Sequence, residues 1–502
     1  MPRLSVLLAD AGITDPRDRA DPDVTRVDYD SRSCAPGSLF VAMRGFHHDG
    51  HAFAADALRR GAVAVVAEQA PEEPPDVPWL IAPDTHVALS ALAAAFEGHP
   101  SRDLCVAGVT GTDGKTTTAT LLWAAWRAAG IRAAALTTVD WRCGDDVIAN
   151  KTRQTTLEAP ELQQHLQRVR ESGCTHVALE TSSHALALHR VDDVDYRCAI
   201  YTKVTSEHLD LHGGRDAYLA AKELLLRGIS QHDDGIAVLD AADDFAFPVL
   251  ASIPVATRLT YSADPSVAAD LVAEDVQVDA RGVRFIARTP WGAARAQLRL
   301  AGRFNAGNAG NALAALAGAV ATGARFDDAV RGIDTLDRVP GRMERVDLGQ
   351  PFAVVVDYAH TAESLETVLR ELRAATHGRV WVVFGSAGER DREKRPAMGA
   401  AAVRLADVAV ITDEDPRQED RLRILEEIAA GATAAGGARG ENVIVVPDRT
   451  DAIQFAVAHA APGDAVLLAG KGHEGSIITG TEAQPWDERA AAEAAIRSRL
   501  RD

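Results

Sequence analysis

The stretch GVTGTDGKTTT, residues 108–118, constrains the fold more than any other part of this chain. It follows the apolar run LCVAGVT, which is typical of a buried strand, and precedes ATLLWAAWRAAG, whose spacing predicts an amphipathic helix. Glycines let backbone N–H groups approach phosphate oxygens, and a helix N-terminus favours negative charge. A strand, a glycine-rich loop and a helix in this order predict an α/β domain that binds a nucleotide phosphate.

Two side chains of this loop have the chemistry that phosphate binding needs. Lys115 would reach the β- and γ-phosphates, and Thr116 would hold Mg²⁺. The local form is GTDGKTT and not the general GxxxxGK[ST], because Gly108 lies one residue too early. A Gly/Thr-rich turn without a ligand is the structural alternative, and nucleotide binding alone names no reaction.

Strand and helix patterns divide the chain into three blocks. Residues 1–100 contain the short apolar runs GSLFVAM and GAVAVVAE with the helical AFAADALRRG between them. Residues 101–338 alternate strands such as THVALE, CAIYTKV and GIAVLD with helical segments, which indicates a mostly parallel sheet covered by helices. Residues 339–502 repeat this alternation and predict a second doubly wound α/β domain.

Four polar motifs of the last block directly follow predicted strands: DYAHT, GSAGERD, TDEDPR and GKGHE. In doubly wound sheets, ligands bind beyond the carboxyl ends of the strands. We therefore expect all four motifs on one ligand-facing edge.

Charge and composition exclude several classes of function. The formal net charge of −19 argues against general binding of nucleic acid or anionic membranes, although a local pocket can still take an anion. No apolar run reaches the ~18–20 residues of a membrane helix, and the N-terminus has no signal-peptide pattern. The five scattered cysteines form no CxxC pair, as in a reducing compartment. We expect a cytoplasmic monomer.

The motif GTDGKTT resembles the ATP loop of the Mur ligases, the ATP-dependent amide-bond ligases of peptidoglycan precursor synthesis. The resemblance extends over nearly the whole chain through DSRSCAPGSLFVAMRG, ETSSHALALHRV, HLDLHGGRDAYLAAKELL, GRFNAGNAGNALAAL, VPGRMERV, DYAHTAESL, GERDREKRPAMG, DEDPRQED and GKGHE. It implies a small N-terminal UDP-binding α/β domain (1–100), a central phosphate-loop ATPase domain (101–338) and a C-terminal Rossmann-like amino-acid-binding domain (339–502). The motifs are similar to those of members that add a diamino acid to UDP-N-acetylmuramoyl-L-alanyl-D-glutamate.

The resemblance also implies the chemistry. A ligase of this kind converts a carboxylate into an acyl phosphate with ATP, and the amine of the incoming amino acid then displaces phosphate. Lys115, Glu180, His208 and Lys222 are the implied catalytic residues, and Mg²⁺ would be held by Thr116, Glu180, His208 and Lys222. Lys222 would be carbamylated, since a carbamate is an anion that can ligate a metal. From the helical run AYLAAKELLL alone, Lys222 is an exposed helix lysine.

The remaining implied site residues fall into groups by ligand. ATP would contact Gly111, Thr112, Asp113, Gly114, Lys115, Thr116, Thr117, Asn305, Asn308, Arg342 and Asp357. The UDP-sugar-peptide would contact Ser31, Phe46, His47, His48, Thr155, Thr156, Ser182 and Arg190. Leu188 stands where the family often has glutamine. Since these residues belong to different blocks, the resemblance implies domain closure during catalysis.

The incoming amino acid would contact Arg390, Glu414, Asp415, Arg417, Gly470 and Glu474. Arg417 could bind the distal carboxylate of meso-diaminopimelate, for which the family motif is typically Asp-Asn-Pro-Arg. Asp415 replaces the neutral amide of that motif, and an anion there would favour the terminal ammonium of L-ornithine or L-lysine. Arg417 could equally pair with Asp415, and the two charges would then neutralise each other. The sequence leaves the amino acid open.

Three rival interpretations fit less of the chain. A folylpolyglutamate synthetase-like ligase shares the ATP loop but lacks the UDP-binding first block. A nucleotide-binding regulator would lack the implied metal ligands. A phosphate-loop GTPase needs an Asn/Thr-Lys-x-Asp signature, which is not found.

Overall fold

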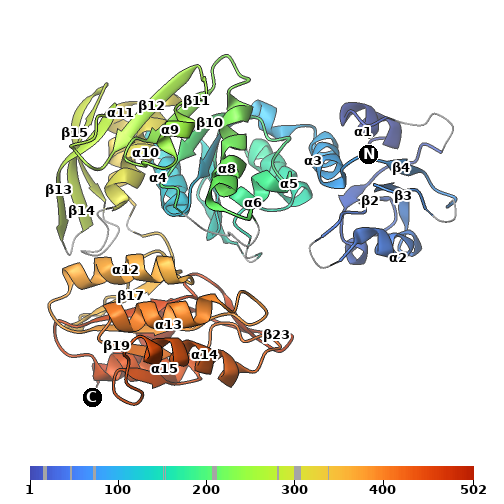
Figure 1. Ribbon diagram of the computed structural model, residues 1–502. Coiled ribbons are helices and arrows are strands. Elements are labelled where there is room, and N and C mark those ends of the chain that lie inside the picture. Colours follow the sequence, from blue (N-terminus) through green and yellow to red (C-terminus); the bar gives the residue numbers. More distant parts are fainter. Residues whose placement is uncertain are drawn as a thin grey trace. The chain divides into compact units, whose positions relative to one another are not determined.

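The computed structural model describes residues 1–14, 20–45, 48–71, 75–150, 152, 154–205, 212–279, 282–298, 307–336 and 338–501. The chain separates into two compact units. Figure 1 labels their helices and strands. The first unit comprises Met1–Ser262, Ser266–Leu271 and Ala314–Ala329, and the second comprises Ala263–Pro265, Val272–Leu313 and Val330–Asp502. Each unit is α/β, as the sequence predicts.

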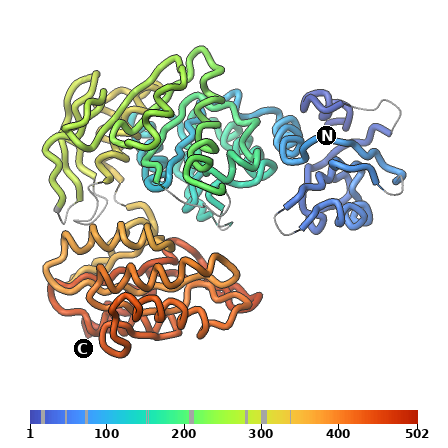
Figure 2. The backbone as a smooth tube through the Cα atoms, viewed as in Figure 1, coloured from blue at the N-terminus to red at the C-terminus, as the bar shows by residue number. Residues whose placement is uncertain are grey.

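The N-terminal part of the first unit is a parallel four-stranded sheet, drawn in blue in Figure 2. Its strands, in the order β1-β2-β3-β4, are β1 (Arg26–Asp28), β2 (Ser38–Val41), β3 (Ala62–Ala67) and β4 (Trp79–Ile81). The helices are α1 (Leu4–Asp10), α2 (Ala54–Arg59) and α3 (Thr85–Phe96), with single turns η1 (Ser31–Ser33), η2 (Gly50–Phe53) and η3 (Pro100–Asp103). Alternate strand residues point to opposite faces, so Leu39 packs in one core with α1 and α3, while Phe40 packs in another with α2.

The larger sheet of the first unit runs in the order β12-β11-β10-β5-β9-β6-β7-β8. These strands are β5 (Cys105–Thr110), β6 (Ala133–Leu136), β7 (Asp140–Cys143), β8 (Asp146–Ala149), β9 (His176–Glu180), β10 (Tyr196–Tyr201), β11 (Ile236–Asp240) and β12 (Thr257–Ser262). All neighbours from β12 to β6 are parallel, and the hairpin β7–β8 adds two antiparallel strands at one edge. The associated helices are α4 (Lys115–Ala128), α5 (Ala159–Glu171), α6 (Ser183–Ala187), α8 (Arg215–Ile229) and α9 (Phe247–Leu250).

Helix α4 differs from its prediction. Every residue from Thr116 to Trp126 is buried, so the helix has no solvent-facing stripe over that stretch. Trp126 donates from its indole Nε1 to Thr322 Oγ1 at 2.8 Å, which satisfies its polar atom inside the core. The amphipathic interpretation was wrong because small alanines and threonines pack on the side where a surface helix carries charge.

The second unit contains an antiparallel meander and a C-terminal sheet. The meander strands are β13 (Leu271–Asp279), β14 (Gly282–Thr289) and β15 (Gly292–Leu298). Helices α10 (Gly307–Ala321) and α11 (Phe326–Asp334) follow in the chain.

The C-terminal sheet has the order β16-β17-β21-β18-β19-β20, and every neighbouring pair except β16–β17 is parallel. Its strands are β16 (Glu344–Arg345), β17 (Ala353–Asp357), β18 (Val380–Phe384), β19 (Val408–Ile411), β20 (Val443–Val445) and β21 (Ala465–Ala469), with a separate hairpin β22 (Ser476–Thr479) and β23 (Glu482–Pro485). One face packs on α12 (Ala362–Ala375), α13 (Lys394–Leu405) and α14 (Arg421–Ala434), and the other on α15 (Arg449–His459) and α16 (Glu488–Arg499). This is the predicted doubly wound sheet.

The four predicted motifs DYAHT, GSAGERD, TDEDPR and GKGHE follow β17, β18, β19 and β21. Since these strands are mutually parallel, the motifs lie on one sheet edge, as predicted. Within the described part of the chain, no helix has both the length and the apolarity to cross a membrane.

Candidate functional site

The phosphate loop closes between β5 and α4 through two glycines. Gly111 has φ 145° and Gly114, the residue that caps α4, has φ 84°. These backbone angles favour glycine and turn the chain sharply into the helix. The side chain of Lys115 folds back and donates from Nζ to the carbonyl oxygens of Gly111, at 3.1 Å, and Thr112, at 2.6 Å. The ammonium therefore lies against the loop, beside the helix N-terminus that favours an anion.

The end of β10 holds this loop in place. Thr202 Oγ1 donates to the carbonyl of Asp113 at 2.6 Å, and the N–H of Thr112 donates to the carbonyl of Lys203 at 2.8 Å. A Cβ on Gly111 would lie 1.8 Å from Thr202 Oγ1. Glycine is required at this position for space as well as for its backbone angle.

Lys222 on α8 is buried beneath the loop and is not the exposed helix lysine that its sequence context indicates. It is 1% exposed, and its Nζ donates to the carbonyl of Gly111 at 2.9 Å and to Thr110 Oγ1 at 3.4 Å. Nζ also lies 4.5 Å from the ring centroid of Tyr218. The context misleads because Lys222 shares its helix face with the buried Tyr218 and Leu219.

Glu180 ends β9, in register with Val109 of the strand that leads into the loop. The residue is fully buried. Its Oε2 accepts a hydrogen bond from Thr138 Oγ1 at 2.6 Å, whereas Oε1 has no hydrogen-bond partner among the described residues. A buried carboxylate oxygen without a donor suits a hard cation such as Mg²⁺. Thr116, 3% exposed, contributes a hydroxyl at the first turn of α4, and His208 lies outside the described residues.

Thr156 and Ser182 lie together beside Glu180. Thr156 Oγ1 donates to the carbonyl of Glu180 at 2.8 Å, and the N–H of Ser182 donates to Thr156 Oγ1 at 3.0 Å. Arg190 joins this group: it donates to the carbonyl of Thr156 at 3.3 Å and pairs with Glu158 at 2.6 Å. Burial raises the pKa of Glu158, and Arg190 opposes that shift. Arg190 Nε is buried and has no hydrogen-bond partner within the described chain, so the guanidinium can bind a further anion.

The other predicted residues of the first unit lie in three places. Ser31 is buried and donates to Asp56 Oδ2 at 3.1 Å. The His48 ring packs edge-on against Phe53 at 6.3 Å, and Phe46 and His47 lie outside the described residues. Thr155 is half-buried next to Thr156, and Thr117 is buried in α4.

The predicted ATP residues of the second unit are described only in part. Asp357 ends β17 and accepts from the N–H groups of Met343, at 2.7 Å, and Ala359, at 2.8 Å. The Arg342 guanidinium lies 5.1 Å from the Tyr358 ring centroid. Asn308 is buried at the start of α10, and Asn305 lies outside the described residues.

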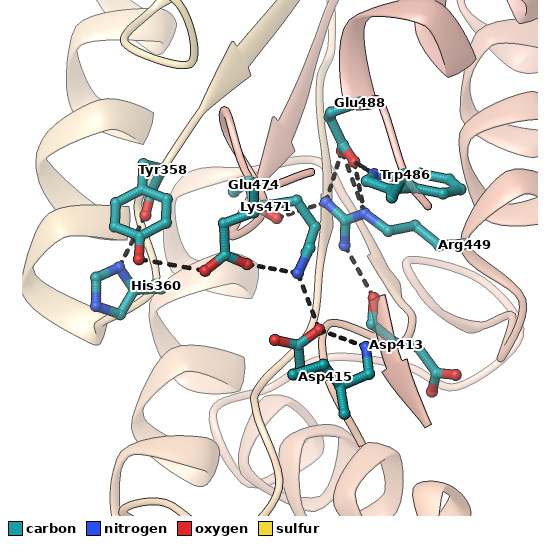
Figure 3. A network of polar contacts seen from close by, with 11 residues as sticks. Tyr358, His360, Asp413, Asp415, Arg449, Lys471, Glu474, Trp486 and Glu488 are labelled. Carbon is teal, nitrogen blue, oxygen red and sulfur yellow. Dashed lines mark hydrogen bonds and ion pairs between the residues drawn. The ribbon is translucent and has the colours of Figure 1, made fainter. Parts of the chain in front are cut away.

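Two of the predicted amino-acid residues, Asp415 and Glu474, contact a lysine that the sequence analysis missed (Figure 3). Lys471 Nζ donates to Asp415 Oδ1 at 2.9 Å and to Glu474 Oε2 at 2.5 Å. Asp415 Oδ1 also accepts from the N–H of Ile478 at 2.9 Å. The charge of Lys471 inside the apolar and glycine-rich sequence LLAGKGHE was the signal that could have identified it.

Other members of this group have unsatisfied polar atoms. Glu414 Oε2 and Arg417 Nε are both buried without a hydrogen-bond partner among the described residues. Gly470 has φ 103°, and a Cβ there would lie 3.3 Å from Glu414 Oε2. Arg390 is exposed at the same sheet edge. An unsatisfied carboxylate oxygen and an unsatisfied guanidinium N–H are the two groups that a zwitterionic ligand would pair.

Arg449 is a second residue that the sequence analysis missed. It is 2% exposed and forms a double hydrogen bond with Glu488, with distances of 2.6 and 2.9 Å. It also donates to the carbonyls of Asp413, at 3.0 Å, and Ala469, at 2.8 Å. Burial lowers the pKa of Arg449, but the charges of Glu488, Glu414 and Glu474 outweigh burial and raise it overall. Arg449 thus ties together the ends of β19 and β21.

Family descriptions match three successive parts of the chain. They are the Mur ligase family catalytic domain at residues 23–97, the Mur ligase middle domain at 109–317 and the Mur ligase glutamate ligase domain at 341–472. The matched parts contain the phosphate loop, Glu180, Lys222, Asp415 and Lys471.

Individual relatives cover almost the whole chain. A UDP-N-acetylmuramyl-tripeptide synthetase of Roseiflexus sp. (strain RS-1) is 48% identical, over 95% of each chain. A UDP-N-acetylmuramoyl-L-alanyl-D-glutamate–2,6-diaminopimelate ligase of Geobacillus thermodenitrificans (strain NG80-2) is 40% identical, over 95% of this chain and 96% of its own. A solved structure of another 2,6-diaminopimelate ligase of that description superposes with a TM-score of 0.63 at 29% identity, over 95% of each chain. The chain belongs to the Mur ligase family.

Proposed function

We propose that this chain adds meso-diaminopimelate to UDP-N-acetylmuramoyl-L-alanyl-D-glutamate through an acyl phosphate made with ATP. The coarser activity follows from family membership and from the named relatives: the chain is an ATP-dependent ligase of peptidoglycan precursor synthesis that adds a diamino acid. The three predicted domains, 1–100, 101–338 and 339–502, would bind the UDP-sugar, ATP and the amino acid. The rival folylpolyglutamate synthetase-like function has no use for the matched segment 23–97.

Several residues of this chain would bind the substrates for the first step, the formation of the acyl phosphate. The loop amides of Gly111 to Thr117 would bind the phosphates, and Lys115 would move from its loop carbonyls onto the β- and γ-phosphates. Arg190 would bind an anionic group of the UDP-dipeptide, beside Thr156 and Ser182.

The residues around Glu180 fit a divalent cation. Glu180 Oε1, buried and without a described partner, would bind Mg²⁺ together with the Thr116 hydroxyl, His208 and a carbamate on Lys222. Bound Mg²⁺ would neutralise the charge that collects where phosphate and carboxylate meet. An unmodified Lys222 donates to the loop carbonyl of Gly111, so carbamylation would replace that hydrogen bond by an anion. Activity that rises with added bicarbonate would support the carbamate.

The choice of amino acid rests on the ion pair between Lys471 and Asp415. From the sequence alone, the negative charge of Asp415 favours L-ornithine or L-lysine. Lys471 offsets that charge in the structure. Arg417, with a buried Nε that has no partner in the described chain, then carries a positive charge toward the substrate. A distal carboxylate pairs with that charge, and a distal ammonium does not.

Phosphate release tests this proposal. Purified protein with Mg²⁺, ATP and the UDP-dipeptide is supplied with meso-diaminopimelate, L-ornithine or L-lysine in parallel. We expect meso-diaminopimelate to give the highest kcat/KM. Preference for L-ornithine or L-lysine would contradict the proposed amino acid but leave the ligase activity intact, whereas no phosphate release with any of the three would contradict the ligase function itself.

A further inference from the structure

The buried charges around Lys471 suggest how the amino-acid pocket sets its selectivity (Figure 3). The Lys471 side chain is fully buried, and the side chains of Asp415 and Glu474 are 4% and 10% exposed. One ammonium therefore faces two carboxylates in a site with little water. Such charges interact more strongly than exposed pairs do, so the position of the ammonium decides which carboxylate the substrate meets as an anion.

We propose that Lys471 is a specificity-determining positioning residue, which neutralises Asp415 and orients Glu474 toward an ammonium of the incoming diamino acid. Neither effect requires Lys471 to touch the substrate. This inference rests on the proposed function, since it assigns the surrounding residues to the amino-acid pocket.

The first effect follows from the contacts of Asp415. Its Oδ1 accepts from both Lys471 Nζ and the N–H of Ile478, so the oxygen is held by a charge and by the backbone. The N–H of Arg417 in turn donates to the carbonyl of Ile478 at 2.9 Å, which fixes Arg417 next to the same hairpin. Without the ammonium, the Asp415 carboxylate would lose the cation that its Oδ1 contacts, two residues from Arg417. The anion would then attract the Arg417 guanidinium and repel a substrate carboxylate.

The second effect follows from the contacts of Glu474. Its Oε2 accepts from Lys471, and its Oε1 lies 3.5 Å from the hydroxyl of Tyr358, at the limit of a hydrogen bond. The Tyr358 ring packs against His473 at 5.0 Å and His360 at 4.7 Å. Glu474 is thus held at both carboxylate oxygens. These contacts fix the direction in which its remaining lone pairs can accept from a substrate ammonium.

A purely structural role is the competing explanation, because removing one partner of a buried ion pair destabilises a protein whatever the site does. Loss of stability would lower turnover of every diamino acid alike. A change in the ratio of kcat/KM between meso-diaminopimelate and L-ornithine, in contrast, reports the charge that the substrate meets. The test therefore uses this ratio in the full-length protein.

The variants are Lys471→Met, Lys471→Arg, Asp415→Asn and the double variant Asp415→Asn/Lys471→Met. Arg423→Met, which removes an exposed ion pair with Glu427, is the matched control. We expect Lys471→Met to lower the ratio about tenfold or more, the size expected for one unbalanced charge near 4 Å at intermediate dielectric. Lys471→Arg keeps the charge, and the double variant removes both, so each should stay within about threefold of the wild type.

Asp415→Asn keeps the test decisive even if Lys471→Met does not fold. This variant leaves the Lys471 ammonium with Glu474 as its one carboxylate partner of the two and makes the pocket more positive by one charge, so we expect the ratio to rise about tenfold or more. A ratio within about threefold of the wild type would show that the substrate does not respond to the charges of this pair and would overturn the proposal. An unchanged ratio in a folded Lys471→Met variant would overturn it equally. A wild type that uses no diamino acid would instead contradict the proposed function.

Discussion

At the scale of a single residue, Glu180 destabilises the folded protein and has a proposed role in catalysis. Its buried Oε1 has no described partner, so the carboxylate loses hydration without full compensation. We expect Glu180→Gln to lower kcat at least about 100-fold and, without Mg²⁺, to raise the free energy of unfolding by about 1 kcal/mol. Phosphate release and chemical unfolding in EDTA measure the two effects.

Glu171→Gln, at the exposed end of α5, is the matched control and should change neither quantity. A Glu180→Gln variant that loses stability in EDTA would show that the carboxylate is satisfied in the metal-free protein. Full activity of the same variant would remove Glu180 from the proposed metal site.

Gly111 and Gly130 flank the same helix and show two different reasons for glycine, which are a lack of space for a Cβ and a positive φ. Both have positive φ, 145° and 78°, but a Cβ at Gly111 would lie 1.8 Å from Thr202 Oγ1, whereas one at Gly130 would meet nothing within 4 Å. We expect Gly111→Ala to weaken ATP binding at least about tenfold, because the clash displaces the loop amides. Gly130→Ala should cost about 1 kcal/mol of stability and leave ATP binding unchanged. Calorimetric titration with ATP distinguishes them, and equal affinities in the two variants would contradict the role of the clash.

Prediction from sequence succeeded or failed at single residues for physical reasons. The phosphate loop was predictable because strand, glycines, lysine and helix are adjacent in the chain. Lys222 was not predictable from its surroundings, because its burial depends on Thr110 and Gly111, more than a hundred residues away. Lys471 was missed because its partner Asp415 follows β19, which is separated from β21 by β18, and a sequence does not show the order of the strands in a sheet.

At the scale of elements, the contact between β7 and α5 gives the protein a dependence of stability on pH. The ring centroids of Trp141 on β7 and His165 on α5 are 4.0 Å apart. Burial, with a smaller effect of Arg168, lowers the pKa of His165 from 6.5 to about 4. Between these values the unfolded chain binds a proton that the folded protein does not. This contribution to stability is therefore complete above pH 6.5, decreases as pH falls toward 4, and is constant below that.

His165→Phe removes the titrating group and keeps a ring against Trp141. Between pH about 7.5 and about 5, we expect the wild type to lose about 1 kcal/mol more stability than this variant, a value reduced for the partial exposure of His165. Guanidinium unfolding followed by circular dichroism at both pH values measures the difference. Parallel losses in the two proteins would show that His165 is hydrated in the folded state.

The existence of helices and strands was predicted better than their burial. The predicted strands that precede the four polar motifs of the last block all exist, because runs such as VWVVF and AVLLA are continuous and bounded by turns. The burial of α4 was not predicted, since alanine and threonine fit both a surface and an interior. Periodicity identifies the strand or helix, whereas the number of covered faces depends on the tertiary packing.

For the whole molecule, the formal net charge of −19 predicts that salt stabilises the fold. Excess carboxylates repel one another in the compact state more than in the expanded chain, and salt shortens the range of that repulsion to about 10 Å at 0.1 M. We expect the midpoint of thermal unfolding near pH 7.5 to rise by a few degrees when NaCl increases from about 0.02 to about 0.3 M. Near the sequence pI of 5.3 the rise should vanish, because the net charge does. If salt instead lowers the midpoint at pH 7.5, then exposed ion pairs such as Arg288–Glu274 outweigh the net repulsion, and screening acts mainly on attraction.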